Sequence, residues 1–189
     1  MSPDDDRDAN FTRLRETQDR FIALWGDMGS HWGVPRSMAE IHALLFIVGE
    51  PLSADEIMER LRVSRGNVSM TLRSLVEWGI VSRSHRREDR RDRFHAEQDV
   101  WKLLITILRV RKRREIDPLL ESLRGCELEG SPSKATADRD SIAEHNDRVR
   151  RMVDMISSVD QLADRLIGPA GPSSEDLESL VRGLAELPQ

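Results

Sequence analysis

The sequence predicts a mainly α-helical protein with one small β-hairpin near its middle. Apolar residues recur every three or four positions over most of the 189 residues, which is the spacing of helices with one buried face. Two short segments near the middle begin with helix-capping residues and are separated by a very short turn. The segment after them loses the helical spacing and favours a hairpin. Longer helices are expected on both sides of this central part.

Composition excludes several classes of protein. The longest apolar run, residues 43–48, is far shorter than the roughly 20 apolar residues of a membrane-spanning helix. The first residues are acidic and polar, so we do not expect a signal peptide. Cys126 is the only cysteine, which argues against a disulfide framework and a cysteine-rich zinc site. We therefore expect a cytoplasmic protein that makes no contact with a membrane.

The net charge of −5 conceals an asymmetry along the chain. Residues 60–115 contain 16 Arg and Lys against 7 Asp and Glu, whereas the remainder contains 13 against 27. Of the 29 basic residues, 26 are arginine, which forms bidentate hydrogen bonds with phosphates and guanine edges. A basic middle in an acidic chain is typical of a local site for a polyanion. From charge alone, a solvated face whose charges form salt bridges with one another is an equally good interpretation.

Two helices are expected before the central part. The first covers residues 11–32 and has a narrow apolar stripe of the coiled-coil type. Its stripe contains Phe11, Leu14, Phe21, Trp25, Met28 and Trp32. Gly33 and Pro35 end this helix. The second covers residues 36–48 and ends at Gly49, where a left-handed residue is favourable.

Two short helices joined by a tight turn form the centre of the chain. Ser53 is a suitable N-cap with Glu56 three residues later, and this helix runs to about Leu61. The next helix begins after Ser64 and ends before Gly79. Its expected buried face consists of Val68, Leu72, Leu75 and Val76. Two such helices with so short a connection are typical of a helix-turn-helix.

The first turns of these two helices differ in charge. The first helix opens with Ala54-Asp55-Glu56, which suits the positive end of a helix, whereas the second opens with Arg65-Gly66-Asn67. A carboxylate there would be repelled by DNA phosphates, and arginine and asparagine can donate to bases or phosphates. The expected DNA contacts on this helix are Ser64, Arg65, Gly66, Asn67, Ser69, Met70 and Arg73. The alternative is that these residues form an ordinary polar outer face that binds nothing, and the difference in charge between the two first turns argues against it.

Residues 80–94 predict a β-hairpin, which completes a winged helix-turn-helix. Apolar residues at 80, 81 and 94 flank a polar tip that runs from Arg86 to Asp92. An arginine at such a tip can enter the narrow minor groove of A·T-rich DNA. The expected DNA contacts of the tip are Arg86, Arg87, Arg90 and Arg91. The alternative is a hairpin that pairs its own charges, although the tip holds more arginines than such pairing needs.

Helices are expected again after the hairpin. Residues 100–124 form one that Pro118 kinks or divides, residues 125–139 have linker composition, and 141–167 approximate a heptad seam. A last short helix follows around residues 177–184. We expect an N-terminal dimerisation helix (1–35), a DNA-binding domain (36–98) and a C-terminal dimerisation region (99–189). The expected dimer contacts are Phe21, Trp25, Met28, Trp32, Ile156 and Val159.

Three segments of the chain carry a family resemblance. They are SRGNVSMTLRSLVEWGIVSR, REDRRDRFHAEQDVWKLL and RVRKRREIDPLLESL. Over residues 20–125 the chain resembles the GbsR branch of the MarR-type winged-helix transcriptional regulators. The resemblance implies a homodimeric repressor that binds pseudo-palindromic operators in double-stranded DNA. Asp89-Arg90-Arg91 is similar to the Asp-x-Arg wing signature, which implies that Arg91 reaches the minor groove and that Asp89 orients it.

Other functions have less support in the sequence. No Gly-rich phosphate loop, GxSxG or HExxH motif occurs, and the five histidines form no HxxxH pair. We therefore expect no enzyme, no cofactor and no metal site. The second interpretation is a winged-helix module that binds another protein, for which Met70 is the only large exposed apolar residue expected on the second helix. A small-molecule effector is a further candidate partner, and the sequence does not indicate its identity.

Overall fold

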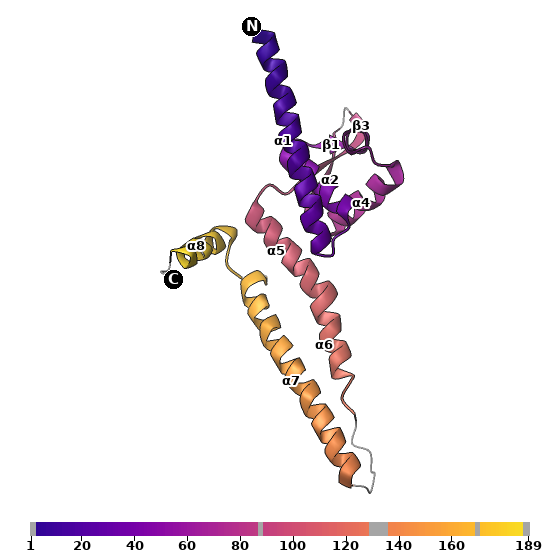
Figure 1. Cartoon of the computed structure of the whole chain (residues 1–189), viewed down its shortest axis with the longest axis vertical. Helices are drawn as coiled ribbons and strands as arrows, with labels where there is room; N and C mark the ends of the chain where they lie inside the picture. Colours follow the sequence, from indigo (N-terminus) through magenta and orange to yellow (C-terminus); the bar gives the residue numbers. More distant parts are fainter. Residues whose placement is uncertain (1–2, 87–88, 129–135, 169–170, 187–189) are drawn as a thin grey trace. The chain divides into compact units, whose positions relative to one another are not determined.

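The computed structural model describes residues 3–86, 89–128, 136–168 and 171–186 (Figure 1). It divides the chain into two compact units, residues 1–103 and 104–189, which are described separately. The prediction of a mainly α-helical fold with a small antiparallel sheet is confirmed. Among the described residues, no helix combines the length and apolar character needed to span a membrane.

The first unit contains a winged helix-turn-helix preceded by a long helix. Its elements are α1 (Pro3–His31), α2 (Arg36–Val48), β1 (Leu52–Ser53), α3 (Ala54–Leu61), α4 (Arg65–Glu77), β2 (Val81–Arg86) and β3 (Asp89–Ala96). α2 lies at the centre of this unit and contacts α1, α3, α4 and β3. The largest fully buried apolar side chains accordingly come from α2, α3 and α4, namely Ile41, Leu44, Leu45, Ile57, Val68 and Leu75.

Small residues allow α1 to approach α2 closely. Ile22, Gly26 and Gly29 are the buried residues of α1. A Cβ atom at Gly29 would lie 2.5 Å from the Cβ of Ala39, which is closer than real Cβ contacts. Nearer the N-terminus, residues 7–17 are all exposed, and Phe11 keeps 66 % of its surface accessible. Only the second half of α1 is therefore part of the core of this unit.

We expect Gly29→Ala to lower the free energy of unfolding by about 1–3 kcal/mol, because the added methyl group forces α1 away from Ala39. Gly66→Ala is the matched control, since a Cβ there would meet nothing within 4 Å. In α4 the exchange of glycine for alanine should raise the free energy of unfolding by up to about 1 kcal/mol, because alanine has the higher helix propensity. Urea denaturation of both variants checks the opposite signs. Equal shifts of the two midpoints would contradict the close approach of the two helices.

The predicted helix-turn-helix is confirmed in its local details. The backbone N–H of Ser53 donates to Glu56 at 2.7 Å, and its hydroxyl accepts from the Glu56 N–H at 3.3 Å, which completes the capping box. Arg62 then adopts a left-handed conformation (φ 54°) and ends α3. The hydroxyl of Ser64 accepts from the N–H of Asn67 at 3.4 Å and begins α4. Short-range hydrogen bonds thus define the turn between the helices.

The structure confirms the cap predicted at the end of α4, but one residue of the predicted buried face is exposed. Gly79 has φ 77°, and the N–H groups of Gly79 and Ile80 donate to Val76 and Leu75, as in a Schellman motif. Leu75 is buried as expected, along with Val68 and Leu72. The expectation that Val76 is buried was wrong. Its side chain is 36 % exposed because it faces the open space between α4 and the hairpin.

The sheet has a strand that the sequence did not predict. β2 and β3 form the expected antiparallel hairpin, with an irregularity between His85 and Arg86. The two-residue strand β1 also pairs with β3, so that the strand order is β1-β3-β2. Two side chains of β3 reinforce this edge, since Arg93 donates to the carbonyl of Pro51 and His95 Nε2 donates to that of Gly49, both at 3.1 Å. The hairpin is thereby held against the end of α2.

A cluster of four aromatic rings joins α1 to α2. Phe21 stacks on Trp25 and Phe46, and His42 stacks on the same two rings, with centroid separations of 5.8–6.3 Å. His42 is only 3 % exposed, and burial lowers the pKa of its imidazole to about 4. Its Nε2 atom has no hydrogen-bond partner. The ring is therefore neutral at physiological pH and packs as an apolar group.

The second unit is a helical hairpin followed by a short helix. Its elements are the end of α5 (Val100–Arg111), a π-helical turn (Lys112–Ile116), α6 (Asp117–Arg124), α7 (Thr136–Ile167) and α8 (Ser174–Ala185). The regular helix is interrupted at the π-helical turn rather than at Pro118. Pro118 instead lies in the first turn of α6, directly after the π-helical turn. α7 begins at Thr136, within the segment expected to be a linker.

Charged groups fasten the two arms of this helical hairpin. The ammonium group of Lys112 lies 3.0 Å from Asp117, 2.9 Å from Asp160 and 3.5 Å from Asp164. Hydrogen bonds with Asp160 and Asp117 raise the pKa of Lys112 above its usual value. Arg109 donates to the carbonyl oxygens of Ile167 and Gly168 at the end of α7. These contacts set which face of α7 lies against α5 and α6.

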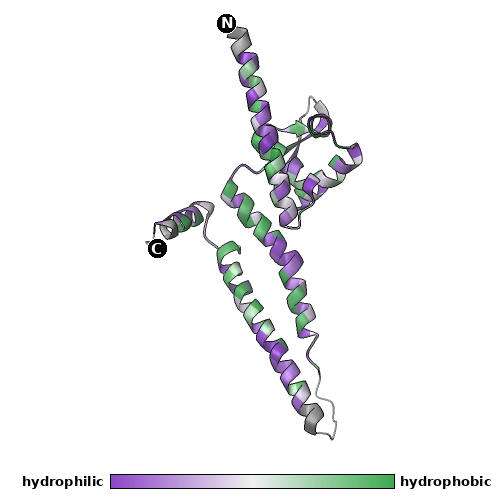
Figure 2. Ribbon diagram, in the orientation of Figure 1, coloured by the Kyte–Doolittle hydropathy of each residue, from purple (hydrophilic) through white to green (hydrophobic). Residues whose placement is uncertain are grey.

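α7 also exposes a regular apolar row (Figure 2). This row, the α7 stripe, is spaced alternately by three and four residues, as in a coiled-coil seam. It consists of Met152, Met155, Val159, Leu162 and Leu166, whose exposure ranges from 42 to 60 %. Ile156 is half-buried instead, and it lines a groove between α7 and the other arm of the helical hairpin together with Met155, Val159 and Leu166 of the stripe. Of the two residues expected to form dimer contacts here, only Val159 belongs to the stripe.

Candidate nucleic-acid interface

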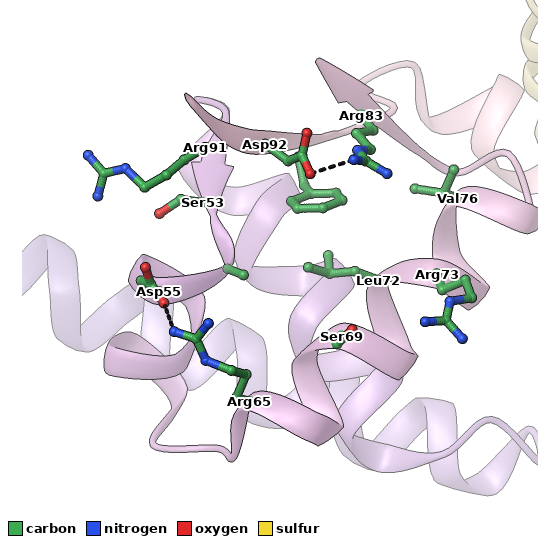
Figure 3. Close-up of a pocket in the computed structure, with 12 residues that line it drawn as sticks. Ser53, Asp55, Arg65, Ser69, Leu72, Arg73, Val76, Arg83, Arg91 and Asp92 are labelled. Carbon is green, nitrogen blue, oxygen red and sulfur yellow. Dashed lines mark hydrogen bonds and ion pairs between the residues drawn. The ribbon is translucent and has the colours of Figure 1, made fainter. Parts of the chain in front are cut away.

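An open groove of about 480 Å³ lies between α4 and the sheet (Figure 3). Its floor is apolar and includes Leu72 and Phe94. Four arginines from three elements surround this α4–wing groove, namely Arg65 and Arg73 on α4, Arg83 on β2 and Arg91 on β3. Asp55 and Asp92 also line it. The fold therefore gathers guanidinium groups that are up to 26 residues apart in sequence around one concave surface.

The residues of α4 predicted to contact DNA are mostly exposed. Arg65, Gly66, Ser69 and Arg73 are accessible, and Met70 has 66 % of its surface exposed. Asn67 is half-buried, and its side-chain oxygen accepts from the hydroxyl of Thr71 at 3.0 Å. Its amide NH₂ group remains chemically suited to donate outward. This arrangement presents the first two turns of α4 as an accessible and mostly polar surface, with Met70 as its apolar member.

Arg65 is held at its position by the neighbouring helix. Its Nη2 atom donates to Oδ1 of Asp55 at 2.8 Å. Asp55 lies in the first turn of α3, and Arg65 is the first residue of α4, so this ion pair joins the N-terminal ends of both helices. The Arg65 side chain nevertheless remains 77 % exposed. It is positioned without being withdrawn from solvent.

A second ion pair lies on the hairpin. Arg83 of β2 is 2.6 Å from Asp92 of β3, and Nδ1 of His85 lies 3.4 Å from the same carboxylate. The hydrogen bond from Arg83, followed by that from His85, lowers the pKa of Asp92. The strand register explains the pairing, because His85 faces Asp92 directly and Arg83 is its diagonal neighbour. Sequence analysis did not identify Asp55, Arg83 or Asp92 as members of the site.

The structure describes only part of the predicted wing tip. Arg91 is exposed and borders the groove at the end nearer to Asp55, whereas Arg73 lies at the other end (Figure 3). The positive charge of Arg91 contributes, after Ser53 and Arg93, to lowering the pKa of Glu56. Arg87 and the side chains of Arg86, Asp89 and Arg90 lie outside the described residues. The orienting role of Asp89 therefore stays a prediction.

The residues expected to mediate dimerisation are distributed over both units. Phe21, Trp25 and Met28 are half-buried against their own chain, and Trp32 is 55 % exposed. Within the described ranges, no three His, Cys, Asp or Glu side chains are grouped so as to hold a metal ion. Of the residues predicted to contact DNA, the α4–wing groove brings together Arg65, Ser69, Arg73 and Arg91.

Comparison with known proteins finds similarity in the central part of the chain. Residues 32–92 match the MarR family. The chain is 22 % identical over 111 residues to the HTH-type transcriptional repressor GbsR of Bacillus subtilis (strain 168). This match covers 59 % of this chain and 61 % of that protein. It is 21 % identical over 96 residues to YvaV of the same organism, whose name assigns it to the HTH-type transcriptional regulators; this match covers 51 % of this chain and 54 % of that protein. The chain thus spans less than two thirds of the length of either relative.

Two solved structures are also similar in part. One is the crystal structure of a transcriptional regulator, with 18 % identity, a TM-score of 0.49 and coverage of 79 % of this chain and 99 % of the other. The second is a mutant of S. aureus MepR bound to an oligodeoxyribonucleotide, with 14 % identity, a TM-score of 0.36 and coverage of 81 % and 97 %. The family match coincides with α2, α3, α4 and the hairpin. Residues 32–92 therefore match the MarR family, and the chain is similar over 51–59 % of its length to the regulators YvaV and GbsR.

Proposed function

We propose that this protein is a transcriptional regulator that binds double-stranded operator DNA as a homodimer and acts as a repressor. The observation that carries the proposal is the α4–wing groove, where four arginines lie beside the exposed first turn of α4. Phosphate neutralisation by such groups dominates the affinity of proteins for DNA. The name of GbsR, a transcriptional repressor, supports the direction of regulation. A DNA-binding role places the protein in the cytoplasm, together with the genome.

The groove suggests how DNA is read. The first turn of α4 carries no acidic residue, and a major groove about 12 Å wide admits an α-helix. Arg65, Asn67 and Arg73 supply the donors for base edges or phosphates, and Met70 supplies an apolar contact for a thymine methyl group. Arg91 extends from the hairpin beside α4 and is the candidate for the minor groove. Both grooves would then be contacted by one face of the domain.

The homodimer is supported by apolar surface that one chain leaves uncovered. The α7 stripe is exposed over its whole length, and the outer half of α1 exposes Phe11 and Leu14. Contiguous apolar surfaces of this kind mark interaction sites, and most soluble oligomers are two-fold symmetric. A two-fold dimer also places two copies of α4 on successive turns of DNA, which suits a pseudo-palindromic operator.

Selection of bound sequences from duplexes with about 30 random base pairs, some three helical turns, tests this function directly. Wild-type protein should enrich a pseudo-palindromic sequence, and binding to it should weaken steeply with salt. Failure to enrich any duplex would overturn the proposal. Retention of other proteins without retention of DNA would favour the protein-interaction module instead.

Arg73→Ala should weaken binding to the enriched duplex by about 1–3 kcal/mol if this side chain contacts a base. The variant should then lose less affinity for a scrambled duplex of equal composition, because binding to that duplex rests on phosphate contacts, which are not sequence-specific. Arg20→Ala is the control, because this exposed arginine on α1 does not line the groove. Fluorescence anisotropy with both duplexes measures the difference. Equal losses on both would assign Arg73 to a phosphate, and unchanged binding would remove it from the interface.

A further inference from the structure

We propose that Asp55 is a positioning residue that orients Arg65 for sequence reading, so that α3 contributes to specificity without itself contacting DNA. The inference rests on the proposed function. It assigns a role to a carboxylate that the sequence analysis treated only as a favourable charge at the start of a helix.

The geometry of the ion pair is the first argument. Asp55 occupies the second position of α3, after the N-cap Ser53, and Arg65 occupies the first position of α4. Both helix starts are fixed by their own serine caps, so the backbones that carry the two side chains are well anchored. The 2.8 Å bond from Arg65 to Asp55 therefore restrains the direction in which the guanidinium group points.

The number of hydrogen-bond donors is the second argument. A guanidinium group has five N–H donors, and the structure shows Asp55 accepting one bond, from Nη2 of Arg65. Four N–H groups remain, and a bidentate contact with a guanine edge needs only two of them. The Arg65 side chain is 77 % exposed, so these donors are open to a ligand. Arg65 can consequently keep its bond to Asp55 while it contacts a base.

The charge of Asp55 has opposite effects on the two kinds of DNA contact. A phosphate can be approached from many directions, so orientation of Arg65 contributes little there, and the nearby carboxylate repels the phosphate. A base edge demands one plane and one direction, so a restrained guanidinium group loses less conformational entropy on binding. Asp55 should thus weaken sequence-independent binding while it preserves operator binding. It raises the ratio between the two affinities.

Arg73 provides an internal comparison. It borders the same groove and is exposed, yet no described residue forms an ion pair with it. Arg73 therefore loses its side-chain conformational freedom only when it binds DNA, whereas Arg65 is already restrained in the free protein. We therefore expect Arg73, unlike Arg65, to show no dependence on a neighbouring carboxylate.

The experiment compares Asp55→Asn with Glu59→Gln, which removes the same charge from an exposed position of α3 outside the groove. The probes are the duplex enriched by wild-type protein and its scrambled counterpart. Glu59→Gln should strengthen binding to both duplexes slightly and equally. Asp55→Asn should strengthen binding to the scrambled duplex but not to the enriched one, so that the affinity ratio falls about five- to tenfold. Equal ratios in the two variants would overturn the inference.

A double-mutant cycle isolates the pair. In the Arg65→Ala background, Asp55→Asn should leave the affinity ratio unchanged, because the side chain that Asp55 orients is absent. A fall in the ratio that persists in this background would also overturn the inference, since Asp55 would then act on DNA by another route. Thermal melting of each variant, followed by circular dichroism, establishes that all are folded. If wild-type protein shows no preference between the duplexes, the proposed function itself fails, which is a distinct outcome.

Discussion

Val159→Asp should convert the protein from a dimer of about 43 kDa, twice the chain mass of 21.6 kDa, into a monomer. Val159 lies at the middle of the α7 stripe and is 60 % exposed in the single chain. In the proposed dimer this position is covered by the second copy, so a carboxylate there would be buried without a partner. Such burial costs several kcal/mol, and the dissociation constant of the dimer should rise more than about 100-fold. Light scattering after size-exclusion chromatography measures the mass.

Gln161→Asp is the matched control for this substitution. Gln161 is exposed on the same helix but does not belong to the α7 stripe, so the added charge should leave the dimer intact. Val159→Asp should also weaken binding to a two-half-site operator far more than binding to a single half-site, because the dimer joins the two contacts. A stable mass of 21.6 kDa for wild-type protein at micromolar concentration would contradict the dimer, and a dimeric Val159→Asp variant would place the interface elsewhere.

Acidification should destabilise the first unit through His42. Burial lowers the pKa of this imidazole to about 4 in the folded state, whereas an unfolded chain has a histidine pKa of about 6.5. Between these values the unfolded state binds more protons, so stability is full above pH 6.5 and falls as the pH drops to about 4. The loss amounts to about 3 kcal/mol. It arises because the ring stacks between Trp25 and Phe46 with no partner for its Nε2 atom.

The variant that tests this is His42→Phe, which keeps an aromatic ring in the cluster and removes the titrating group. Urea denaturation at several pH values should show the variant gaining stability relative to wild type as the pH falls from 7 to 4. His31→Phe is the control, because His31 is exposed and lies outside the aromatic cluster, so that its substitution leaves the buried ring of His42 in place. A pH-independent difference for His42→Phe would contradict the buried neutral imidazole.

Much of the central domain was predictable because its determinants are local. The caps of α3 and α4 are hydrogen bonds between residues three apart, and the Schellman motif after α4 involves residues three to five apart. Each depends on the identity of a few neighbouring side chains and on the conformational freedom of Gly79. The helical periodicity of the remaining segments likewise indicated which faces are apolar. The order of the elements and the polar face of α4 followed from these patterns.

Other features needed the tertiary structure because they join distant parts of the chain. β1 has only two residues and exists because Leu52 pairs with Phe94, a partner that no local pattern indicates. The exposure of Val76 and the contact of Gly29 with Ala39 depend on how closely neighbouring elements pack. The same holds for the candidate site, where Asp55 meets Arg65 across two helix starts and Arg83 meets Asp92 across two strands.

The sequence by itself therefore determined the helices and the hairpin of the central domain and the caps of its helices, since these follow from interactions between residues within about one or two helical turns. Tertiary structure decided which charges face one another, which apolar residues are covered and which stay exposed on α7. The physical reason is that a side chain's partner is set by the position of the backbone that carries it, and that position results from packing over the whole unit.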